Sequence, residues 1–256
     1  MSGLLEGKRI FVAGVLVENS IGYAVAKAAQ EHGAQVVISN FGRGLSITKR
    51  VAKKLPVEPP VLEVDVTDGE HLATLPDKLR EHVDGLDGVV HAIAWAPQEA
   101  MGEDFVSTPW ETVAPGVQVS TWSLAALTNA CLPLLTDRSS VVGFDFDATV
   151  AWPAYGWMGV AKAGMESASR YLARQLGPRG VRVNLVSAGP LSSMAKRAIP
   201  GAEEFTGGWD GRAPLGWDDA DFEPTAQAAA ALLSDLFPKT TGEIIHVDGG
   251  YHAIGA

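Results

Sequence analysis

Two side chains with complementary chemistry lie close together in the stretch WPAYGWMGVAKAGMES, which runs from Trp152 to Ser167. Tyr155 offers a phenol, and Lys162 offers an amine about two turns further along the helix that is predicted there. A phenol can donate a hydrogen bond to a reacting oxygen, and a nearby ammonium can lower the phenol's pKa from its ordinary value of about 10. A packing or capping role for Tyr155 and a solvated helix position for Lys162 are the alternatives.

A second group of residues is suited to binding phosphate at the start of a helix. In VAGVLVENSIG a predicted strand ends at Gly14, and Ser20 and Ile21 open a helix after a short turn. Free backbone N–H groups and the positive end of the helix dipole then face the end of the strand, and this arrangement binds a pyrophosphate. The pattern is not the usual G-x-G-x-x-G, and a tight strand-to-helix turn also needs a glycine for steric reasons. By itself it leaves a nucleotide site and a structural turn equally open.

A carboxylate follows the third predicted strand. Asp65 and Val66 end the stretch PPVLEVDV, at a place where a carboxylate could meet the amino group of an adenine. An aspartate that only caps the turn after a strand is the alternative, and for Asp65 taken alone it is the stronger interpretation.

The elements that must position these residues alternate between short apolar stretches and segments with helical periodicity. The apolar stretches are hydrophobic throughout, as strands buried on both faces of a parallel sheet require. We therefore predict a Rossmann-type, doubly wound α/β fold with a seven-stranded parallel sheet, helices on both faces, and ligands at the carboxyl ends of the strands. The predicted strands cover residues 8–17, 34–41, 59–66, 86–94, 139–146, 181–189 and 242–250.

One segment interrupts this alternation. Residues 190–217 are rich in Gly and Pro and follow the sixth predicted strand, and loops of this length inside compact domains are usually functional. We predict that they form a flap that covers the substrate. With no internal repeat and no low-complexity linker, the chain is expected to be a single domain over residues 1–256.

The composition argues against several classes of protein. A formal net charge of −10 opposes binding to nucleic acid and to anionic membrane surfaces, since both need an excess of Lys and Arg. Cys131 is the only cysteine, so no intramolecular disulfide can form, and the six histidines show no metal-ligand spacing. No stretch reaches the length of a membrane span. We expect a cytoplasmic protein without a metal, a nucleic-acid partner or a stable membrane association.

Together these motifs resemble the enoyl-acyl-carrier-protein reductases in their actinobacterial form, a divergent branch of the short-chain dehydrogenase family. The ordinary alcohol dehydrogenases and ketoreductases of this fold have their lysine four residues after the tyrosine, where this chain has Gly159. Their upstream serine is also missing, since Val142 and Gly143 stand there. The resemblance covers nearly the whole chain, through GVLVENSI, EVDV, HAIAWAPQ, FDFDATVAWPAYGWMGVAK, SAGPLSSMA and GEIIHVDGG.

The resemblance implies an NADH-dependent reduction of the trans-2 double bond of an enoyl thioester in fatty acid elongation. Hydride would go to the β-carbon, and Tyr155 would stabilise the negative charge that grows on the thioester oxygen by a hydrogen bond. Lys162 would hold the ribose hydroxyls of the cofactor. Phe146 stands where many members have a second tyrosine, and it would form a wall of the substrate channel or of the nicotinamide site. A core aromatic is the alternative for Phe146.

The same resemblance assigns further positions around the cofactor and the acyl chain. Leu191 would hold the nicotinamide carboxamide through its backbone, with a hydroxyl of Ser193, or of Ser192 instead, near a phosphate. Trp95 would line the acyl path, while Met158 and Trp157 fit either the acyl pocket or the core. Ala94 and Trp95 replace a common Gly-Phe pair, which narrows the space there. The remaining cofactor positions are Ala92, Ile93, Gly189 and Pro190.

The choice of cofactor depends on the end of the second predicted strand, SNFGRG. No acidic residue stands there to bind the adenine ribose 2′-hydroxyl. Phe41 could stack on the adenine, as in the NADH-using members, whereas Arg43 could accommodate a 2′-phosphate. We expect NADH/NAD⁺ rather than NADPH.

The net charge and the length of the flap bear on the acyl carrier and on the acyl chain length. An enzyme of net charge −10 needs a local basic patch to receive an acidic acyl carrier protein, and Lys196, Arg197 and Arg212 are the candidates, with an ordinary solvated face as the alternative. Acyl carrier protein and coenzyme A both remain open as carriers. The flap is shorter than in members devoted to very long chains, which suggests short or medium acyl groups. The fold usually buries its C-terminal strand region against partners, so we expect a homotetramer.

Two other functions compete with this one. A carbonyl (β-ketoacyl) reductase of the same fold is disfavoured by the missing serine and by the Tyr-Lys spacing. A non-catalytic dinucleotide-binding regulator is disfavoured because Tyr155 and Lys162 are both present. The fold alone cannot choose among these functions, because it serves many.

Overall fold

The computed structural model describes residues 3–102 and 104–255. Within them a single sheet has the strand order β3-β2-β1-β4-β5-β6-β7, and every neighbouring pair is parallel. The predicted seven-stranded parallel sheet is therefore confirmed, and its strand order reverses between β1 and β4, the point at which sheets of this kind bind ligands at their carboxyl ends. The strands are β1 (Arg9–Ala13), β2 (Gln35–Asn40), β3 (Val61–Glu63), β4 (Leu86–His91), β5 (Leu135–Asp145), β6 (Arg182–Ala188) and β7 (Ile244–Val247).

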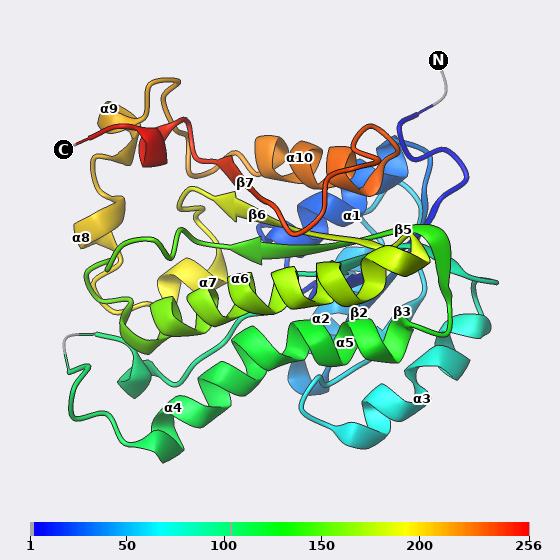
Figure 1. The fold of residues 1–256 in the computed structure, drawn as a ribbon, viewed down its shortest axis with the longest axis horizontal. Helices are drawn as coiled ribbons and strands as arrows, with labels where there is room; N and C mark the ends of the chain where they lie inside the picture. The colour runs from blue at the N-terminus through cyan, green and yellow to red at the C-terminus, as the bar shows by residue number, and fades with distance from the viewer. Residues whose placement is uncertain (1–2, 103, 256) are drawn as a thin grey trace.

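Helices cover both faces of the sheet (Figure 1). One face packs against α1 (Ile21–Glu31), α2 (Gly42–Ala52) and α10 (Glu223–Leu233). The other packs against α3 (Gly69–Arg80), α5 (Ser123–Cys131) and α6 (Gly156–Leu176). A π-helical turn, η2 (Gln118–Trp122), joins α4 (Trp110–Val117) to α5. The short elements are η1 (Gln98–Ala100), η3 (Gly177–Arg179), η4 (Tyr251–Ala253), α7 (Met194–Arg197), α8 (Glu203–Thr206) and α9 (Trp209–Arg212).

The first helix shows how local sequence sets these boundaries. The Ser20 hydroxyl accepts a hydrogen bond from the backbone N–H of Tyr23 at 3.3 Å, which caps α1 as predicted. The helix ends at Glu31, and Gly33 follows with a φ of 91°, a conformation that glycine adopts without a Cβ penalty. The small buried residues on the inner face of α1 let it pack closely on the sheet.

Six of the seven strands are shorter than the predicted ranges, and two further differences change the elements themselves. Strand β5 begins at Leu135, four residues before the predicted start, and its pairing with β4 shifts register between Leu86 and Gly88. The polar residues there are held by side-chain bonds, because the Ser139 hydroxyl donates to the carbonyl of Leu86 at 2.7 Å. The second difference is in residues 190–217, which contain three short helices, α7, α8 and α9, rather than an irregular loop.

Three further properties of the described residues concern membrane spans, metal sites and the single cysteine. None of their helices is both long and apolar enough to cross a membrane. Nor do they bring together a cluster of His, Cys, Asp and Glu that could hold a metal ion. Cys131 is buried, and burial raises the pKa of its thiol, so it is a core residue without nucleophilic character.

Candidate active site

The turn from β1 to α1 is too tightly packed for side chains. Gly14 has a φ of 95°, and a Cβ there would lie 2.3 Å from the carbonyl oxygen of Ala92. A Cβ on Gly22 would lie 3.0 Å from the carbonyl oxygen of Gly14. The first turn of α1 carries no acidic residue, so the positive end of its dipole is not neutralised by its own side chains. This backbone surface, with Ser20 and Ile21 at the helix start, fits the phosphates of a dinucleotide.

The segments after β4 and β6 complete that surface. The backbone N–H of Ala92 donates to Ala13 at 2.9 Å, so the chain after β4 runs beside the end of β1. Ile93 is half-buried and Ala94 is exposed. From the other side, the Asn19 side-chain amide donates to the Ser192 carbonyl at 3.3 Å. The predicted cofactor positions after β1, β4 and β6 are therefore brought to one edge of the sheet.

The end of β2 carries an aromatic ring and a carboxylate. Phe41 is 48% exposed at the N-cap position of α2. Asn40 orients the chain there, since its side-chain oxygen accepts from the Phe41 N–H at 2.8 Å. Glu63 lies opposite Asn40 in the β2–β3 register, and its carboxylate accepts from the Gly42 N–H at 3.2 Å. The sequence shows no acidic residue at this strand end, but the tertiary structure brings one there from β3.

Asp65 and Val66 follow β3. One carboxylate oxygen of Asp65 accepts from the backbone N–H of Thr67 at 2.9 Å and from its hydroxyl at 2.7 Å. This oxygen therefore caps the turn after β3, which is the alternative role expected for Asp65. Val66 is buried in the core under α3. Both residues lie beside the end of β2, where Phe41 stands, because β2 and β3 are paired.

Tyr155 stands at the start of α6 on an unusual backbone. Ala154, just before it, has a φ of 60° and is the only non-glycine residue with a positive φ in residues 3–102 and 104–255. Gly156, just after it, has a φ of 47°, and the Gly102 N–H donates to the Ala154 carbonyl at 2.9 Å. Sparsely populated conformations of this kind persist where the surroundings enforce them, and they concentrate at functional sites.

The phenol of Tyr155 is buried and protonated. Burial raises its pKa well above the ordinary value, and the negative charge of Asp145 raises it further. The expectation that Lys162 lowers this pKa is wrong for this structure, because burial and Asp145 dominate. Tyr155 is therefore a hydrogen-bond donor at neutral pH, and it also packs in a buried apolar cluster at the start of α6, as the alternative expected.

Lys162 is not a solvated helix residue. Its side chain lies on the inner face of α6, the residue is only 5% exposed, and its Nζ donates to the carbonyl oxygen of Phe144 at 2.7 Å. Burial lowers the pKa of the ammonium, and Asp145 opposes that change. The structure thus holds the amine of Lys162 at the carboxyl end of β5, about two helix turns beyond Tyr155.

A wall of aromatic rings extends from Tyr155 to the C-terminal segment. Phe146 meets Tyr155 edge-on at 5.3 Å, Trp152 at 5.2 Å and Trp209 at 5.9 Å between ring centroids. Trp209, in α9, stacks on Tyr251 at 3.7 Å and donates from its indole to the Asp248 carbonyl at 3.0 Å. Sequence analysis missed Trp152, Trp209 and Tyr251, although aromatic residues in a Gly-rich segment are a detectable signal.

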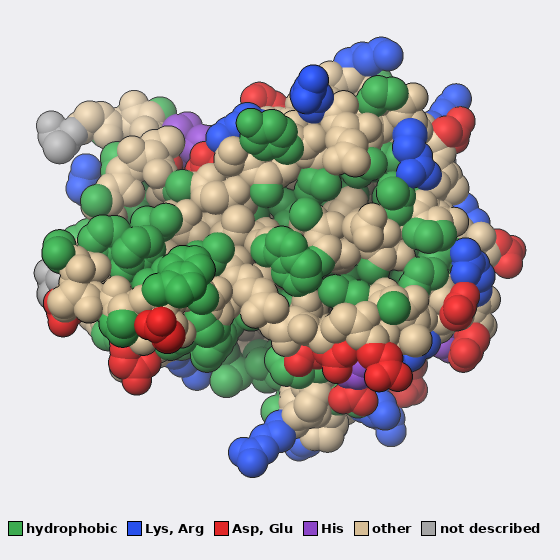
Figure 2. Space-filling view, turned by 60° about the horizontal axis from the view of Figure 1, so that its bottom comes forward, with side chains coloured by type: hydrophobic (Ala, Val, Ile, Leu, Met, Phe, Trp, Pro, Cys, Tyr) green, Lys and Arg blue, Asp and Glu red, His purple; other side chains and the backbone are tan. Residues whose placement is uncertain are grey.

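Met158 and Trp95 differ in their surroundings. Met158 is buried in a small apolar cluster with Tyr155, and Ile199 from residues 190–217 packs on that cluster. Trp95 is 53% exposed, while its backbone N–H donates to the Ser120 hydroxyl at 2.9 Å. Figure 2 shows hydrophobic side chains gathered at the left end of the molecule, the end at which α6 begins in Figure 1. An apolar ligand would find contact surface there.

The chain after β6 is anchored by Trp217. A Cβ on Gly189 would lie 2.7 Å from the Trp217 ring, whose indole N–H donates to the Pro190 carbonyl at 2.7 Å. Leu191 is buried. The Ser193 hydroxyl caps α7 by accepting from the Lys196 N–H at 3.2 Å.

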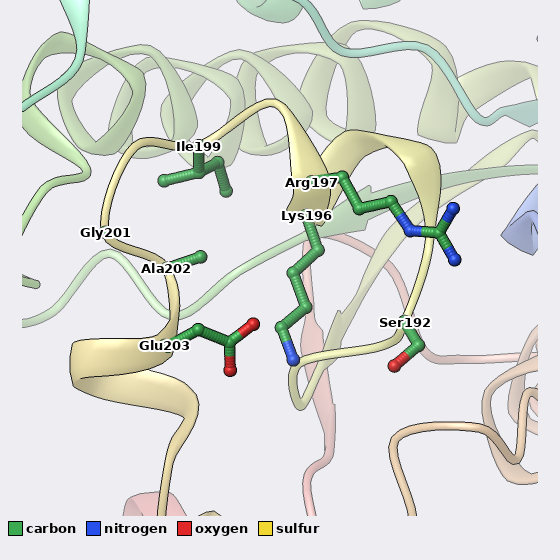
Figure 3. A pocket seen from close by; sticks show the side chains of 7 residues that line it. All are labelled: Ser192, Lys196, Arg197, Ile199, Gly201, Ala202 and Glu203. Carbon is green, nitrogen blue, oxygen red and sulfur yellow. The ribbon is translucent and has the colours of Figure 1, made fainter.

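Ser192 and Lys196 line a pocket of about 340 Å³ in the predicted flap, with Arg197, Ile199, Gly201, Ala202 and Glu203 (Figure 3). Lys196 donates to Asp219 at 2.9 Å with a side chain that is only 13% exposed. Arg212 lies over the Tyr251 ring, 4.7 Å from its centroid. Lys196 and Arg212 were predicted to form a docking patch with Arg197, but in the structure they bind Asp219 and the Tyr251 ring of the same chain.

Two buried titratable groups near Lys162 escaped the sequence analysis. His91, at the end of β4, shares a hydrogen bond with the Ser123 hydroxyl at 2.7 Å. Burial, together with the charge of Lys162, lowers its pKa to about 3, so the ring is neutral. Asp145 ends β5, and burial raises its pKa to about 7, against the effect of Lys162. A charged residue at the end of an otherwise apolar strand was the available signal for Asp145.

A parallel sheet with a tight glycine turn after β1, and with a tyrosine and a lysine at the start of the helix after β5, is typical of the short-chain dehydrogenase class of α/β proteins. The family model described as enoyl-(acyl carrier protein) reductase matches residues 14–252. The chain belongs to this family.

Curated relatives agree with this assignment. An enoyl-[acyl-carrier-protein] reductase [NADH] from Mycolicibacterium smegmatis is 46% identical, over 98% of both chains. The enzyme of that name from Mycobacterium avium is 44% identical, again over 98% of both chains. The FabI enzyme of Neisseria meningitidis is 37% identical over 97% of this chain and 96% of its own. The resemblance to the actinobacterial form is thereby confirmed.

Proposed function

We propose that this protein reduces the trans-2 double bond of an enoyl thioester with NADH, in fatty acid elongation. The observation that carries the proposal is the buried, protonated phenol of Tyr155, which contacts the ring of Phe146 and precedes the buried Lys162 at the carboxyl edge of the sheet. The curated relatives are named as enzymes of this reaction class, which supports it.

The residues along the sheet edge have the properties that a dinucleotide needs. The Gly14 turn and the start of α1 at Ser20 and Ile21 would hold the pyrophosphate. Phe41 would stack on the adenine, with Asp65 and Val66 beside it. Lys162 would hold the ribose hydroxyls. The nicotinamide would lie against the segments that contain Ala92, Ile93, Ala94, Gly189, Pro190, Leu191 and Ser193.

The chain's own part in the reaction is electrostatic. When bound, the reduced nicotinamide supplies a hydride to the β-carbon of the enoyl group. Tyr155 donates a hydrogen bond to the thioester oxygen, where negative charge develops, and a donor held in a water-poor site stabilises such charge more than water does. Because burial keeps its pKa high, Tyr155 donates this hydrogen bond without releasing its proton first. Phe146 keeps water away from one side of the phenol.

Glu63 favours NADH over NADPH at the adenine end. Its carboxylate lies at the end of β2, bonded to the Gly42 N–H beside Phe41. A carboxylate there accepts hydrogen bonds from ribose hydroxyls and repels a 2′-phosphate. The position of Glu63 therefore supports NADH as the cofactor, rather than NADPH, whose 2′-phosphate Arg43 could accommodate.

The acyl group would occupy the apolar end of the molecule. Met158, Trp95 and the ring of Phe146 supply contacts, and residues 190–217 would act as the flap of a single domain over 1–256. The aromatic wall through Trp152 and Trp209 limits the space beside Tyr155, which supports short or medium acyl chains. The thioester would be carried by acyl carrier protein, with Arg197 as the remaining exposed cation for docking, or by coenzyme A.

A homotetramer is part of the proposal. Strand β7 is the last strand of the sheet, and its four residues, Ile244–Val247, are only half-buried. An apolar edge strand of this kind is usually covered, and a second copy of the chain would cover it.

The two competing functions lose support. A carbonyl reductase of this fold would need a lysine where Gly159 stands, and a Cβ at that position would meet only the ring of Tyr155 at 3.5 Å. A non-catalytic regulator would not need a buried phenol on a strained backbone beside a buried ammonium. Neither alternative explains the Tyr155 geometry.

The test is the loss of nicotinamide absorbance when the purified protein meets NADH and a trans-2-octenoyl thioester. We expect turnover with this substrate, none with a β-ketoacyl thioester, and a loss on the order of a hundredfold in kcat for Tyr155→Phe, the usual effect of removing one such donor. Tyr171→Phe is the matched control, since Tyr171 is 70% exposed on the same helix. Activity on the ketone alone, or tight NADH binding without turnover, would overturn the proposal.

A further inference from the structure

The segment after β7 is built around a buried aspartate. Asp248 is 5% exposed, and its carboxylate accepts hydrogen bonds from the backbone N–H groups of Gly250 at 2.8 Å and His252 at 2.9 Å. The same carboxylate shares a hydrogen bond of 2.9 Å with the imidazole of His252. Hydrogen bonds to a buried carboxylate are strong and fix the backbone around it. Tyr251, between the two bonded residues, is therefore held in place.

The proposed flap is attached to this segment, which runs beside α9 in Figure 1. The indole N–H of Trp209, in α9, donates to the backbone carbonyl of Asp248 at 3.0 Å. At the end of the flap, the Leu215 N–H donates to the Gly249 carbonyl at 3.1 Å. A Cβ on Gly249 would lie 2.4 Å from the carbonyl oxygen of Gly216, so only glycine allows the two backbones to come this close. The last part of the flap thus lies directly on the segment after β7.

Tyr251 joins the flap to the turn that carries Tyr155. The Tyr251 ring stacks on that of Trp209, with 3.7 Å between the centroids and 13° between the planes. It also lies 5.9 Å from the ring of Trp152, whose backbone carbonyl accepts from the Tyr155 N–H at 3.3 Å. The guanidinium carbon of Arg212 lies 4.7 Å from the Tyr251 centroid. Side chains from the flap and from the turn before α6 therefore meet at one ring.

Trp209 is buried although its helix is short and lies at the surface. The other residues of α9 are exposed, yet Trp209 is only 3% exposed. Its indole packs against the rings of Phe146 at 5.9 Å, Trp152 at 5.5 Å and Tyr251 at 3.7 Å. A helix of four residues is too short to be stable by itself, so these ring contacts set the position of the indole. Tyr251 makes the closest of the three.

We propose that Tyr251 is a positioning residue that determines which acyl chains the enzyme accepts. By holding Trp209 against Phe146, it fixes how closely the proposed flap approaches the space beside the Tyr155 phenol. The site then takes an octenoyl group in preference to longer chains. This inference rests on the proposed function for the identity of the substrate, and it assigns the choice of acyl length to a residue that acts through Trp209.

The consequence is a separation between chain selection and chemistry. Without the Tyr251 ring, Trp209 keeps its hydrogen bond to Asp248 but loses its stacking partner, so its indole is free to turn away from the acyl space. A longer acyl chain then gains apolar contact, whereas a shorter chain loses a wall on which to pack. The Tyr155 phenol and the cofactor site stay as they are.

The experiment compares trans-2-octenoyl and trans-2-dodecenoyl thioesters by steady-state kinetics at saturating NADH. Tyr251→Ala should raise kcat/KM for the dodecenoyl relative to the octenoyl thioester roughly threefold to tenfold, the range that one stacked aromatic pair contributes. The change should appear in KM, with kcat for the octenoyl thioester within about twofold of the wild type. Tyr251→Phe keeps the stacked ring and should keep the wild-type ratio. Tyr171→Ala, which removes an exposed ring from α6, is the matched control.

A double-mutant cycle tests whether Tyr251 acts through Trp209. Trp209→Leu should change the ratio in the same direction, and adding Tyr251→Ala to it should change the ratio no further, because the two residues then act as a unit. Additive effects of the two substitutions would show that Tyr251 acts by another route and would overturn the proposal.

The remaining outcomes separate this inference from the proposed function. A wild-type ratio in Tyr251→Ala, or a kcat that falls alike for both thioesters, overturns the positioning role, since general damage to the flap does not select chain length. If Tyr251→Ala fails to fold, as judged by circular dichroism, Tyr251→Leu decides by the same ratio, because it keeps an apolar side chain without the stacking. Failure of the wild-type protein to reduce either thioester overturns the proposed function, and this inference with it.

Discussion

The ring of Phe146 meets the ring of Tyr155 edge-on, with 5.3 Å between their centroids and 62° between their planes. The same Phe146 ring lies 5.9 Å from Trp209 in α9. One aromatic residue after β5 therefore contacts both the phenol that we place in the reaction and the segment that we propose as the flap. Edge-to-face pairs of this kind hold their rings in a preferred geometry. Substitutions in this wall should change which acyl chains fit without removing the phenol.

Trp152 is the part of the wall best suited to a test. Its ring contacts Phe146 at 5.2 Å and Trp209 at 5.5 Å, and it is only half-buried, so the fold should tolerate a smaller side chain. Trp152→Leu should raise kcat/KM for a trans-2-dodecenoyl thioester relative to the octenoyl thioester by a few fold, about 1 kcal/mol or less of added contact. Trp110→Leu, an exposed tryptophan on α4, is the control. An unchanged ratio would show that the wall does not limit chain length.

Lys162 should be needed for the cofactor rather than for the fold. Lys162→Met replaces a buried ammonium with an apolar side chain of similar length, a change that is often neutral for stability when charge burial is relieved. NADH affinity, measured by fluorescence titration, should fall on the order of tenfold or more, since charge-assisted hydrogen bonds contribute about 1.5–3 kcal/mol. Lys8→Met, which removes a cation paired with the exposed Asp235, serves as the control. Wild-type affinity in Lys162→Met would contradict the assignment.

Glu63 should control the choice between the two nicotinamide cofactors. Glu63→Gln removes the negative charge beside Phe41 while keeping a group that can accept from the Gly42 N–H. The ratio of kcat/KM for NADPH to that for NADH should rise roughly fivefold to tenfold, because a 2′-phosphate no longer meets a carboxylate. The effect should shrink at high salt, where exposed charges are screened. Glu58→Gln, an exposed residue before β3, should leave the ratio unchanged.

His91 should make the fold sensitive to acid. Burial and Lys162 lower its pKa from 6.5 to about 3, so between these values the unfolded chain binds a proton that the folded chain does not. Stability contributed by the neutral ring is present above pH 6.5 and is lost as the pH falls, by about 1.4 kcal/mol per pH unit. The difference in unfolding free energy between the wild type and His91→Gln should shrink at that rate as the pH falls, measured by urea denaturation. A difference that does not change with pH would contradict it.

Much of the fold could be predicted because its signals are local. Uniformly apolar strands indicate a parallel sheet wherever they pair, and Ser20 and Gly33 mark the ends of α1 through their own hydrogen bonds and φ angle. The early start of β5 could not be predicted in this way, because polar residues such as Ser139 are held in the strand by the carbonyl of Leu86 from another strand.

The site shows the same division. The spacing of Tyr155 and Lys162 on one helix sufficed to single them out and to indicate the family. Glu63 reaches the end of β2 only through the β2–β3 register, and Lys162 reaches the Phe144 carbonyl only because β5 packs beneath α6. Trp209 joins Phe146 across more than sixty residues of chain. No pattern within a single stretch of sequence could report these pairings.

The sequence by itself determined the alternation of strands and helices, the turn at Gly14 and the placement of a phenol and an amine on one helix face, because each depends on residues near one another in the chain. Only the tertiary structure decided the charge states. Burial keeps the Tyr155 phenol protonated and the His91 ring neutral, and it raises the pKa of Asp145 while it lowers that of Lys162. A pKa responds to the dielectric and to charges from every neighbouring element, and these neighbours exist only once the chain has folded.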